Sequence, residues 1–560
     1  MLTETPLTQA SETQRGRLGW WLADDRPPLT GDAALTEALA RVGRPVHVVD
    51  DDGRLAVGAG GTAVIGPQPI EGLQGDEDAY PLAGFAPAIL PEQLGDAAFR
   101  ATHGLRYAYV AGAMANGITS EQMVEAMGRS GMIGFFGAAG LDLPRIEQAI
   151  DRLQKALPDG PFGFNLIHSP SDPQLEAATV DLYLRRGIRL VSASAYLDLT
   201  LPLVRYRVTG IHRGADGEIV APNRVIAKVS RVEVARKFFS PPPKTMLDKL
   251  VQAGDITPEQ AVLAARIPVA EDLTAEADSG GHTDNRPAIS LLPTMLALRD
   301  EMQAEHGYLT RLRVGAAGGI ATPASAAAAF AMGAAYVLTG SINQSCVEAG
   351  TSATVRELLA GASQADVIMA PAADMFEMGV NVQVLKRGTM FPMRARKLYE
   401  LYRAYNSLDE IPASQRAALE RDYFHAPLEQ VWQQTWDFFQ HRDPSQNERA
   451  GRDPKHKMAL VFRAYLGQAS HWAVAGDPDR RMDYQVWCGP AMGAFNEWAG
   501  GSFLEKPDNR DVVTVAMNLL VGAAALTRAN WLRAQGVPLP PRALRFAPRT
   551  RAELAALTHG

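Results

Sequence analysis

Several features that would assign a protein to a special class are scarce in this chain of 560 residues. It contains two cysteines, Cys346 and Cys488, which lie far apart and predict a reduced protein without a disulfide framework. Its formal net charge is −7, so it lacks the positive charge of a general nucleic-acid binder. It also lacks the CxxC and HExxH spacings of common zinc sites, and we expect no metal.

Long apolar runs are scarce as well. The first residues contain no basic segment followed by an apolar core, so we expect no secretory signal. The most apolar long segment covers residues 512–527, which is too short to span a bilayer and includes Asn518. A buried helix capped by Asp511 is the favoured interpretation. These absences predict a cytoplasmic protein that does not contact a membrane.

The composition and length predict a folded chain with several parts. The apolar content is 46%, and a chain of this length allows about two to four domains. Residues 1–95 predict a small αβ domain, because β-rich runs on both sides of Asp52-Gly53 indicate a hairpin. Residues 366–560 are mostly helical in pattern and rich in tryptophan, and this region could cap the mouth of the central domain.

The central domain, residues 96–365, alternates apolar segments with helical patterns, which predicts a (β/α)₈ barrel. The segments are near-continuous apolar runs, as parallel strands buried on both faces should be. Strands are expected at 107–113, 132–136, 161–167, 188–193, 224–230, 269–276, 312–316 and 335–339. Two insertions, a hairpin over 201–223 and a short helical pair over 240–267, could shape the site or decorate the outer ring.

Two glycine turns follow the last two expected strands. Gly318-Gly319 and Gly340-Ser341 would present free backbone N–H groups on one rim of the barrel. Such groups suit a phosphate, because they offer partial positive charge with no side chain in the way. A plain βαβ unit with tight turns is the alternative.

A third glycine cluster follows the sixth expected strand. Gly280 and Gly281 would let a flat cofactor ring approach the backbone closely. His282 would then project at the rim where catalytic groups of such barrels lie. A structural histidine is the alternative.

Three other segments could contact the same ring. Small residues over 111–118, after the first strand, suit a flat ring that lies over bare backbone. Asn165 ends the third strand and can both donate and accept hydrogen bonds at the edge of a flavin or pyrimidine. Lys228 lies in an otherwise apolar strand and needs an anion, which could be a reduced flavin, a phosphate or a neighbouring carboxylate.

The motifs AGAMANGI, GMIGFFGAAGL, PFGFNLIHSP, ADSGGHTDNRP, AAGGIATP and GAAYVLTGSINQS occur in this order. They resemble the flavin barrels of the nitronate monooxygenase and FabK enoyl reductase type. Through KRGTMFPMRARKLYELY and the helical tail, the whole chain resembles the PfaD family. Members of that family are trans-acting enoyl reductases that serve polyunsaturated fatty acid synthases and trans-acyltransferase polyketide synthases.

This resemblance implies FMN as cofactor, NADPH (with NADH less favoured) as hydride source, and a 2-enoyl thioester on an acyl carrier protein as substrate. His282 would be the active-site histidine, which could protonate the α-carbon or stabilise charge at the thioester oxygen. The cofactor-binding residues that the resemblance implies, together with the residues discussed above, are Ala113, Met114, Asn116, Asn165, Lys228, Gly280, Gly281, Gly318, Gly319, Gly340 and Ser341.

Two rival functions are considered. A nitronate monooxygenase-like oxidase would use His282 as base on a small nitroalkane, and a non-catalytic scaffold would keep only the fold. The helical region and the basic run over 386–403 favour the reductase, because an acidic carrier protein could dock on a basic patch. A solvated helix face is the alternative for that run. A homodimer is also considered, since the alanine-rich helices could pack between subunits or within one.

Overall fold

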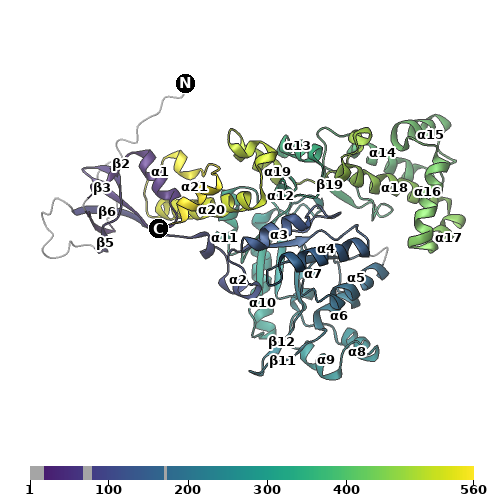
Figure 1. The fold of residues 1–560 in the computed structure, drawn as a ribbon, viewed down its shortest axis with the longest axis horizontal. Coiled ribbons are helices and arrows are strands. Elements are labelled where there is room, and N and C mark those ends of the chain that lie inside the picture. Colours follow the sequence, from purple (N-terminus) through teal and green to yellow (C-terminus); the bar gives the residue numbers. More distant parts are fainter. Residues whose placement is uncertain (1–17, 25, 67–78, 170–172, 560) are drawn as a thin grey trace.

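The computed structural model describes residues 18–24, 26–66, 79–169 and 173–559. A closed ring of parallel strands lies at its centre, in the order β10-β13-β14-β16-β17-β7-β8-β9 (Figure 1). The predicted (β/α)₈ barrel is confirmed, because each expected segment overlaps one of these strands. The strands are β7 (Tyr109–Ala111), β8 (Ile133–Phe136), β9 (Gly163–Ile167), β10 (Leu190–Ser194), β13 (Arg224–Val229), β14 (Asp272–Glu276), β16 (Arg313–Ala317) and β17 (Val337–Thr339).

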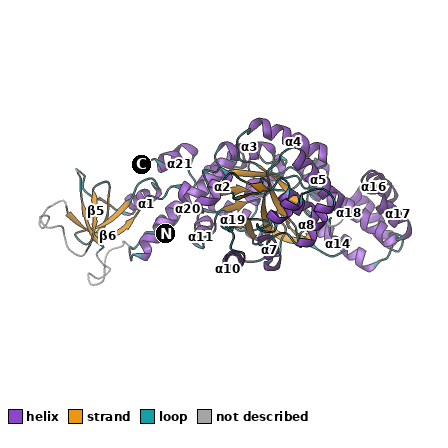
Figure 2. Ribbon diagram, turned by 90° about the horizontal axis from the view of Figure 1, so that it is seen from below, coloured by secondary structure: helices purple, strands orange, loops and turns teal. Residues whose placement is uncertain are grey.

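Helices between these strands form the outer layer, and Figure 2 shows the strands enclosed by them. They are α2 (Ala97–His103), α3 (Glu121–Arg129), α4 (Leu143–Ala156), α5 (Pro173–Arg185), α6 (Leu201–Val208), α7 (Val232–Phe239), α10 (Ala288–His306), α11 (Pro323–Ala331) and the short α12 (Ser341–Gln344). The predicted helical pair over 240–267 is present as α8 (Lys244–Gln252) and α9 (Pro258–Ala264).

The predicted hairpin over 201–223 is wrong in its first part. Residues 201–208 form helix α6, which begins at the N-cap Thr200 with a proline in its first turn. The helix buries Leu203, Val204 and Tyr206 against the barrel, so packing outweighs the strand-like character of this run. Only the outer part is a hairpin, formed by β11 (His212–Arg213) and β12 (Ile219–Val220).

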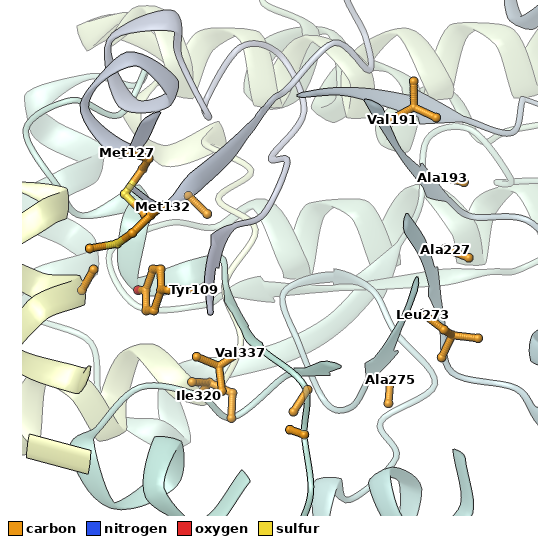
Figure 3. Close-up of a cluster of buried hydrophobic side chains, with 14 of the residues drawn as sticks. Tyr109, Met127, Met132, Val191, Ala193, Ala227, Leu273, Ala275, Ile320 and Val337 are labelled. Atoms are coloured by element: carbon orange, nitrogen blue, oxygen red, sulfur yellow. The ribbon is translucent and has the colours of Figure 1, made fainter. Parts of the chain in front are cut away.

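Alternate residues of the barrel strands face two different cores. One set, which includes Val110, Ile133, Phe135 and Ile226, packs in a cluster within the ring. The other set packs against the surrounding helices. Figure 3 shows part of it, with Val191 and Ala193 of β10, Ala227 of β13, and Leu273 and Ala275 of β14 on neighbouring strands. Burial on both faces explains why the strands read as continuous apolar runs.

The N-terminal part is a separate antiparallel sheet in the order β2-β4-β3-β6-β1-β5, covered by α1 (Asp32–Ala40). The predicted turn at Asp52-Gly53 is confirmed, with φ of 49° and 82° at the two positions, as a tight hairpin turn requires. The first 17 residues, on which the expected lack of a secretory signal rests, lie outside the described residues. The strands are β1 (Gly19–Leu22), β2 (Leu29–Thr30), β3 (Val46–Asp51), β4 (Arg54–Gly58), β5 (Thr62–Ile65) and β6 (Ala79–Ala86).

Residues after the barrel lie in two places. A helical region with its own core extends away from the N-terminal sheet and occupies the right of Figure 1. It contains β18 (Val367–Pro371), β19 (Asn381–Leu385), α14 (Phe391–Ala404), α15 (Ala413–Leu419), the π-helix η3 (Glu420–Phe424), α16 (Leu428–Arg442), α17 (Pro444–Arg452) and α18 (Pro454–Ala475). Helices α13 (Ala353–Ala360), α19 (Ala491–Ala499), α20 (Val512–Ala534) and α21 (Arg551–Thr558) return to the barrel and the sheet.

Helix α20 connects the barrel to the N-terminal sheet. It packs on α11 of the barrel and on α1 and β6 of the sheet, so the alanine-rich α11 is covered within this chain. The predicted cap is confirmed, because the Asp511 carboxylate accepts a hydrogen bond from Thr514 N at 2.8 Å. The helix is long and apolar enough to cross a membrane, but 89% of its most apolar 18-residue window is buried within the fold. At its far end the buried Arg528 donates to the carbonyls of Leu39 and Arg41 at the end of α1.

A buried ion pair closes the barrel at its amino-terminal end. Asp272 and Arg313 begin the neighbouring strands β14 and β16, and Arg313 Nε donates to Asp272 Oδ1 at 2.6 Å. His103 Nε2 lies 2.9 Å from the other carboxylate oxygen. Burial would raise the pKa of Asp272, but hydrogen bonds and charge from His103 and Arg313 lower that pKa to about 2. At this end of a barrel, such a cluster serves stability.

We therefore predict that Asp272→Asn destabilises the protein by about 3–5 kcal/mol, because it leaves the buried Arg313 guanidinium without a carboxylate. Unfolding by urea would measure this, with the exposed Asp151→Asn as control, for which about 0.5 kcal/mol or less is expected. Since the folded pKa of Asp272 lies below its unfolded value of about 3.9, its contribution is complete above that pH and disappears as pH falls to about 2. Equal stability of Asp272→Asn and wild type would contradict this role.

Candidate active site

A cavity of about 1070 Å³ lies at the carboxyl ends of the barrel strands, between the barrel mouth and the helical region. All of the residues that the sequence singled out as catalytic or cofactor-binding line it. They are Ala113, Met114, Asn116, Asn165, Lys228, Gly280, Gly281, His282, Gly318, Gly319, Gly340 and Ser341. The structure thus brings together residues from segments that are well separated in the sequence, and the roles assigned to them stay predictions.

The two glycine turns lie on one rim, because β16 and β17 are paired neighbours in the ring. Gly318 and Gly319 adopt φ of 81° and 75°, which favour glycine. A Cβ on Gly318 would lie 2.5 Å from the Ala277 carbonyl carbon, so the Gly318 backbone packs closely against the backbone at Ala277. A Cβ on Gly319 or Gly340 would meet no atom within 4 Å, so these two residues present bare backbone to open space in the cavity.

The segment at Cys488 and Gly489, which follows the helical region, closes one side of this rim. The Ser341 hydroxyl accepts a hydrogen bond from Gly489 N at 3.1 Å. A Cβ on Gly280 would lie within about 3 Å of the Cys488 backbone, so the glycine there permits close approach of two chain segments. The sequence had suggested that Gly280 makes room for a cofactor ring; the structure shows that it also makes room for Cys488.

His282 is held by an added sheet outside the barrel. The two-residue strand β15 (Gly281–His282) pairs with β19, which pairs with β18. The side chain of Gln383 on β19 donates to Asp278 Oδ1 and to the Ser279 carbonyl, both at 2.8 Å. Backbone pairing and this amide therefore fix the loop that carries His282 at the rim of the cavity.

A carboxylate that sequence reasoning missed faces the histidine. His282 Nε2 lies 3.2 Å from Oδ1 of Asp374, on the connection between β18 and β19. Burial lowers the pKa of His282, but the hydrogen bond and negative charge of Asp374 outweigh burial, and the pKa is raised above its usual value. Asp374 is 92 residues away in sequence and belongs to the helical region, so no local motif could have identified it.

Lys228 also has a carboxylate partner. Its Nζ donates to Glu276 Oε1 at 2.5 Å. Of the anions considered for Lys228, the structure therefore shows the neighbouring carboxylate. Glu276 is the last residue of β14 and accepts a further hydrogen bond from the Ser279 hydroxyl at 3.2 Å. Both side chains line the cavity close to His282, whose pKa responds to both charges.

The two asparagines have different surroundings. Asn165 is buried in the middle of β9 and not at its end, where the sequence pattern placed it, and its Oδ1 accepts a hydrogen bond from the Ser194 hydroxyl at 3.1 Å. Asn116 has φ of 57°, and its side-chain amide donates to the Ser470 hydroxyl of α18 at 3.1 Å. Asn116 thus joins the barrel rim to the helical region, a contact that the sequence pattern did not indicate.

The site contains no metal-binding cluster that can be recognised in the described part of the chain. Among those residues, no group of three or more histidine, cysteine, aspartate or glutamate side chains is placed to hold a metal ion. The groups available for chemistry are instead the His282–Asp374 pair, the Lys228–Glu276 pair and the exposed backbone of the glycine turns.

Comparison with known families finds two matches, which meet near the end of α14. A family profile described as nitronate monooxygenase matches residues 100–401, which is more than half of the chain. A second profile, described as the inserted helical domain of [acyl-carrier-protein] S-malonyltransferase, matches residues 405–484. The second match covers α15–α18, and residues of α16, α17 and α18 line the cavity above the barrel.

Individual relatives agree with the first match. A polyunsaturated fatty acid synthase polypeptide of Thraustochytrium sp. is 50% identical over 447 residues, which are 79% of this chain and 30% of that protein. The polyketide biosynthesis protein PksE of Bacillus subtilis is 47% identical over 439 residues, 78% of this chain and 57% of that protein. The chain spans between 22% and 57% of the length of four such curated relatives.

A solved structure also aligns with most of the chain. The enoyl reductase domain of MlnA, from the macrolactin biosynthesis cluster of Bacillus amyloliquefaciens, is 42% identical with a TM-score of 0.75. The alignment covers 78% of this chain and 99% of that domain. The likeness therefore includes the helical region as well as the barrel.

We predict that Asp374→Asn lowers the pKa of His282 from above to below its ordinary value. The reason is that the substitution removes the negative charge and leaves the effect of burial. Titration of isotope-labelled histidine by NMR measures it. Asp284→Asn is the matched control, because Asp284 also lines the cavity but pairs with Arg231 and Ser230. A His282 pKa that is unchanged in Asp374→Asn would show that the pair is not an electrostatic unit.

Proposed function

Because this chain belongs to the nitronate monooxygenase family and, within it, to the group that contains the enoyl reductase domain of MlnA, we propose that it is an enoyl reductase. It would reduce 2-enoyl thioesters carried on an acyl carrier protein, in polyketide or polyunsaturated fatty acid biosynthesis. The observation that carries the proposal is the arrangement of bare glycine backbone opposite a carboxylate-paired histidine across one cavity.

The cofactor in this proposal is FMN. Gly319 and Gly340 leave space where any other residue would place a Cβ, and their N–H groups suit the phosphate of a mononucleotide. Asn165 has its Oδ1 engaged by Ser194, while no hydrogen bond within the described residues uses its amide nitrogen. That nitrogen would donate to the edge of the flavin ring, and the loop at Ala113 and Met114 would lie along it.

When bound, FMN would supply hydride transfer from NADPH to the β-carbon of the enoyl thioester. A proton must then reach the α-carbon, and His282 would donate it from Nδ1, the ring nitrogen that Asp374 does not contact, or hold the charge that develops at the thioester oxygen. Asp374 raises the pKa of His282, so the protonated imidazole needed for either task persists closer to neutral pH. Asp374 would orient the histidine and favour its protonated form without itself giving up a proton.

The proposed partner is an acidic carrier protein, with the basic run over 386–403 as its docking surface. Arg394 is not available, because it pairs with the buried Asp483. Lys386, Arg396 and Lys397 are exposed and form no ion pair within the described residues. An outward-facing basic surface on a protein of net charge −7 would steer an acidic partner. A cytoplasmic location belongs to the same proposal.

The test is anaerobic reduction with NADPH, followed by flavin absorbance. We expect the purified protein to carry FMN, to bleach with NADPH, and to regain colour with crotonyl thioester on a carrier protein. The rival function, oxidation of nitroalkanes, predicts instead that colour changes only with nitroalkane and oxygen. If the protein binds no flavin, both the reductase and the oxidase functions are contradicted, and the non-catalytic scaffold is the function that remains.

His282→Ala tests the acid in the same assay. We predict reoxidation by the enoyl thioester to slow by about 10²–10⁴-fold with flavin content unchanged, since a positioned acid contributes about that much. His471→Ala is the control, because His471 also lines the cavity but lies on α18 and forms no ion pair in the described chain. Unchanged turnover in His282→Ala would remove this residue from the mechanism.

Gly340→Val tests the phosphate site. The position has φ of −129°, so a side chain adds no left-handed strain there, and its atoms would fill the open space. We predict that FMN affinity falls by about tenfold or more because the phosphate is displaced, with little change in Tm of the flavin-free protein. Gly361→Val, at an exposed glycine with φ of −90° outside the cavity, is the control. Flavin titration by fluorescence measures the Kd for FMN. An unchanged Kd in Gly340→Val would contradict the proposed phosphate site.

A further inference from the structure

The cavity continues beyond the groups that the proposed reaction uses, into a groove between α16 and α18. One face of each helix lines it, at the spacing of successive turns. The lining side chains are Val431, Thr435 and Phe438 on α16, and Leu460, Ala464 and Gly467 on α18. This α16–α18 groove belongs to the segment that matches the inserted helical domain of a transferase acting on carrier proteins.

Polar side chains such as Gln434, Gln468 and His471 stand beside the apolar ones in the walls of the groove, and two arginines there have partners within the chain. Arg463 lies 3.2 Å from Glu377 and donates to the Ala373 carbonyl at 2.9 Å. Arg480 pairs with Asp483 at 3.3 Å, and its guanidinium stacks on Trp472 at 4.2 Å. These cations need no ligand, so they would not draw a charged molecule into the groove.

The groove begins beside the predicted flavin edge. Ser470 of α18 is bonded to Asn116 on the barrel rim at 3.1 Å, and Gly467 lies one helical turn further out. From Ser470 to Leu460 a helix advances about 15 Å. An extended chain advances roughly 1.2 Å per bond, so this distance fits roughly twelve carbons.

Gly467 keeps the groove open. A Cβ at this position would meet no atom within 4 Å, although the residue lies in the middle of α18, where glycine is otherwise unfavourable. On the α16 wall, Phe438 is 53% exposed, and the guanidinium carbon of Arg442 lies 5.6 Å from the centre of its ring. Gly467 thus leaves space that no atom of the described chain fills, and Phe438 presents an aromatic ring to the cavity.

We propose that the α16–α18 groove holds the acyl chain of the substrate beyond the reacting double bond, and that Gly467 determines the length of chain accepted. The inference rests on the proposed function and adds its substrate class, namely long, apolar 2-enoyl thioesters. An apolar chain fits because the groove is continuous with the site, presents Val431, Phe438, Leu460 and Ala464 along its walls, and is about as long as a medium or long acyl chain.

The test compares crotonyl and 2-dodecenoyl thioesters of N-acetylcysteamine, which lack the long pantetheine arm. In Gly467→Leu, we expect kcat/KM for the dodecenoyl thioester to fall by about tenfold or more, with the crotonyl value within about twofold of wild type. Gly451→Leu is the matched control, because Gly451 is also a helical glycine with no atom near its Cβ, but it lies outside the cavity. It should leave both values unchanged.

A second variant guards against misfolding. Phe438→Ala removes an exposed side chain and should lower kcat/KM for the long thioester by about threefold or more, with crotonyl turnover retained. Equal loss on both thioesters in Gly467→Leu, or no loss on either, would overturn the assignment of the groove to the acyl chain while leaving the reductase function standing. If wild type reduces neither these thioesters nor the crotonyl thioester on a carrier protein, the proposed function is wrong and the inference falls with it.

Discussion

The backbone pairing of β15 with β19 is the interaction on which the rest of the site depends. It joins the loop after the sixth barrel strand to a hairpin outside the barrel. Through this pairing His282 meets Asp374, and the helical region is held above the mouth. Without it, the histidine would lie on a glycine-rich loop with little to fix its position, and a catalytic acid must be held closely to be useful.

The sequence was informative where structure is local and repeated. Continuous apolar runs identified every barrel strand, and paired glycines marked the turns that line the cavity. It was misleading at residues 201–208, where an N-cap at Thr200 and burial of Tyr206 favour a helix. It was silent on Asp374, because that residue reaches His282 only through tertiary pairing between distant segments. The same is true of the contact between Asn116 and Ser470.

The helical region changes what the barrel mouth can do. A barrel alone offers a rim, whereas here α16 and α18 add a second wall and extend the cavity to about 1070 Å³, more than one drug-sized ligand usually needs. The arginines of this wall are satisfied by Glu377, Asp483 and backbone carbonyls. Apolar side chains such as Val431 and Phe438 and uncharged polar ones such as Gln434 and Gln468 line the added space. Its shape and length, more than charge, would therefore select what enters.

The hydrogen bonds from Arg528 to the carbonyls at the end of α1 affect how the protein could attach to a larger assembly. Because this guanidinium ties α20 to the N-terminal sheet, and α20 also packs along α11, sheet and barrel are joined by one continuous buried rod. The sheet lies at one extremity of the long axis and the α14–α18 helices at the other (Figure 1). A tether attached to the N-terminal sheet would thus leave the entrance of the cavity unobstructed. Two partner proteins, one at each end of the molecule, could then bind at the same time.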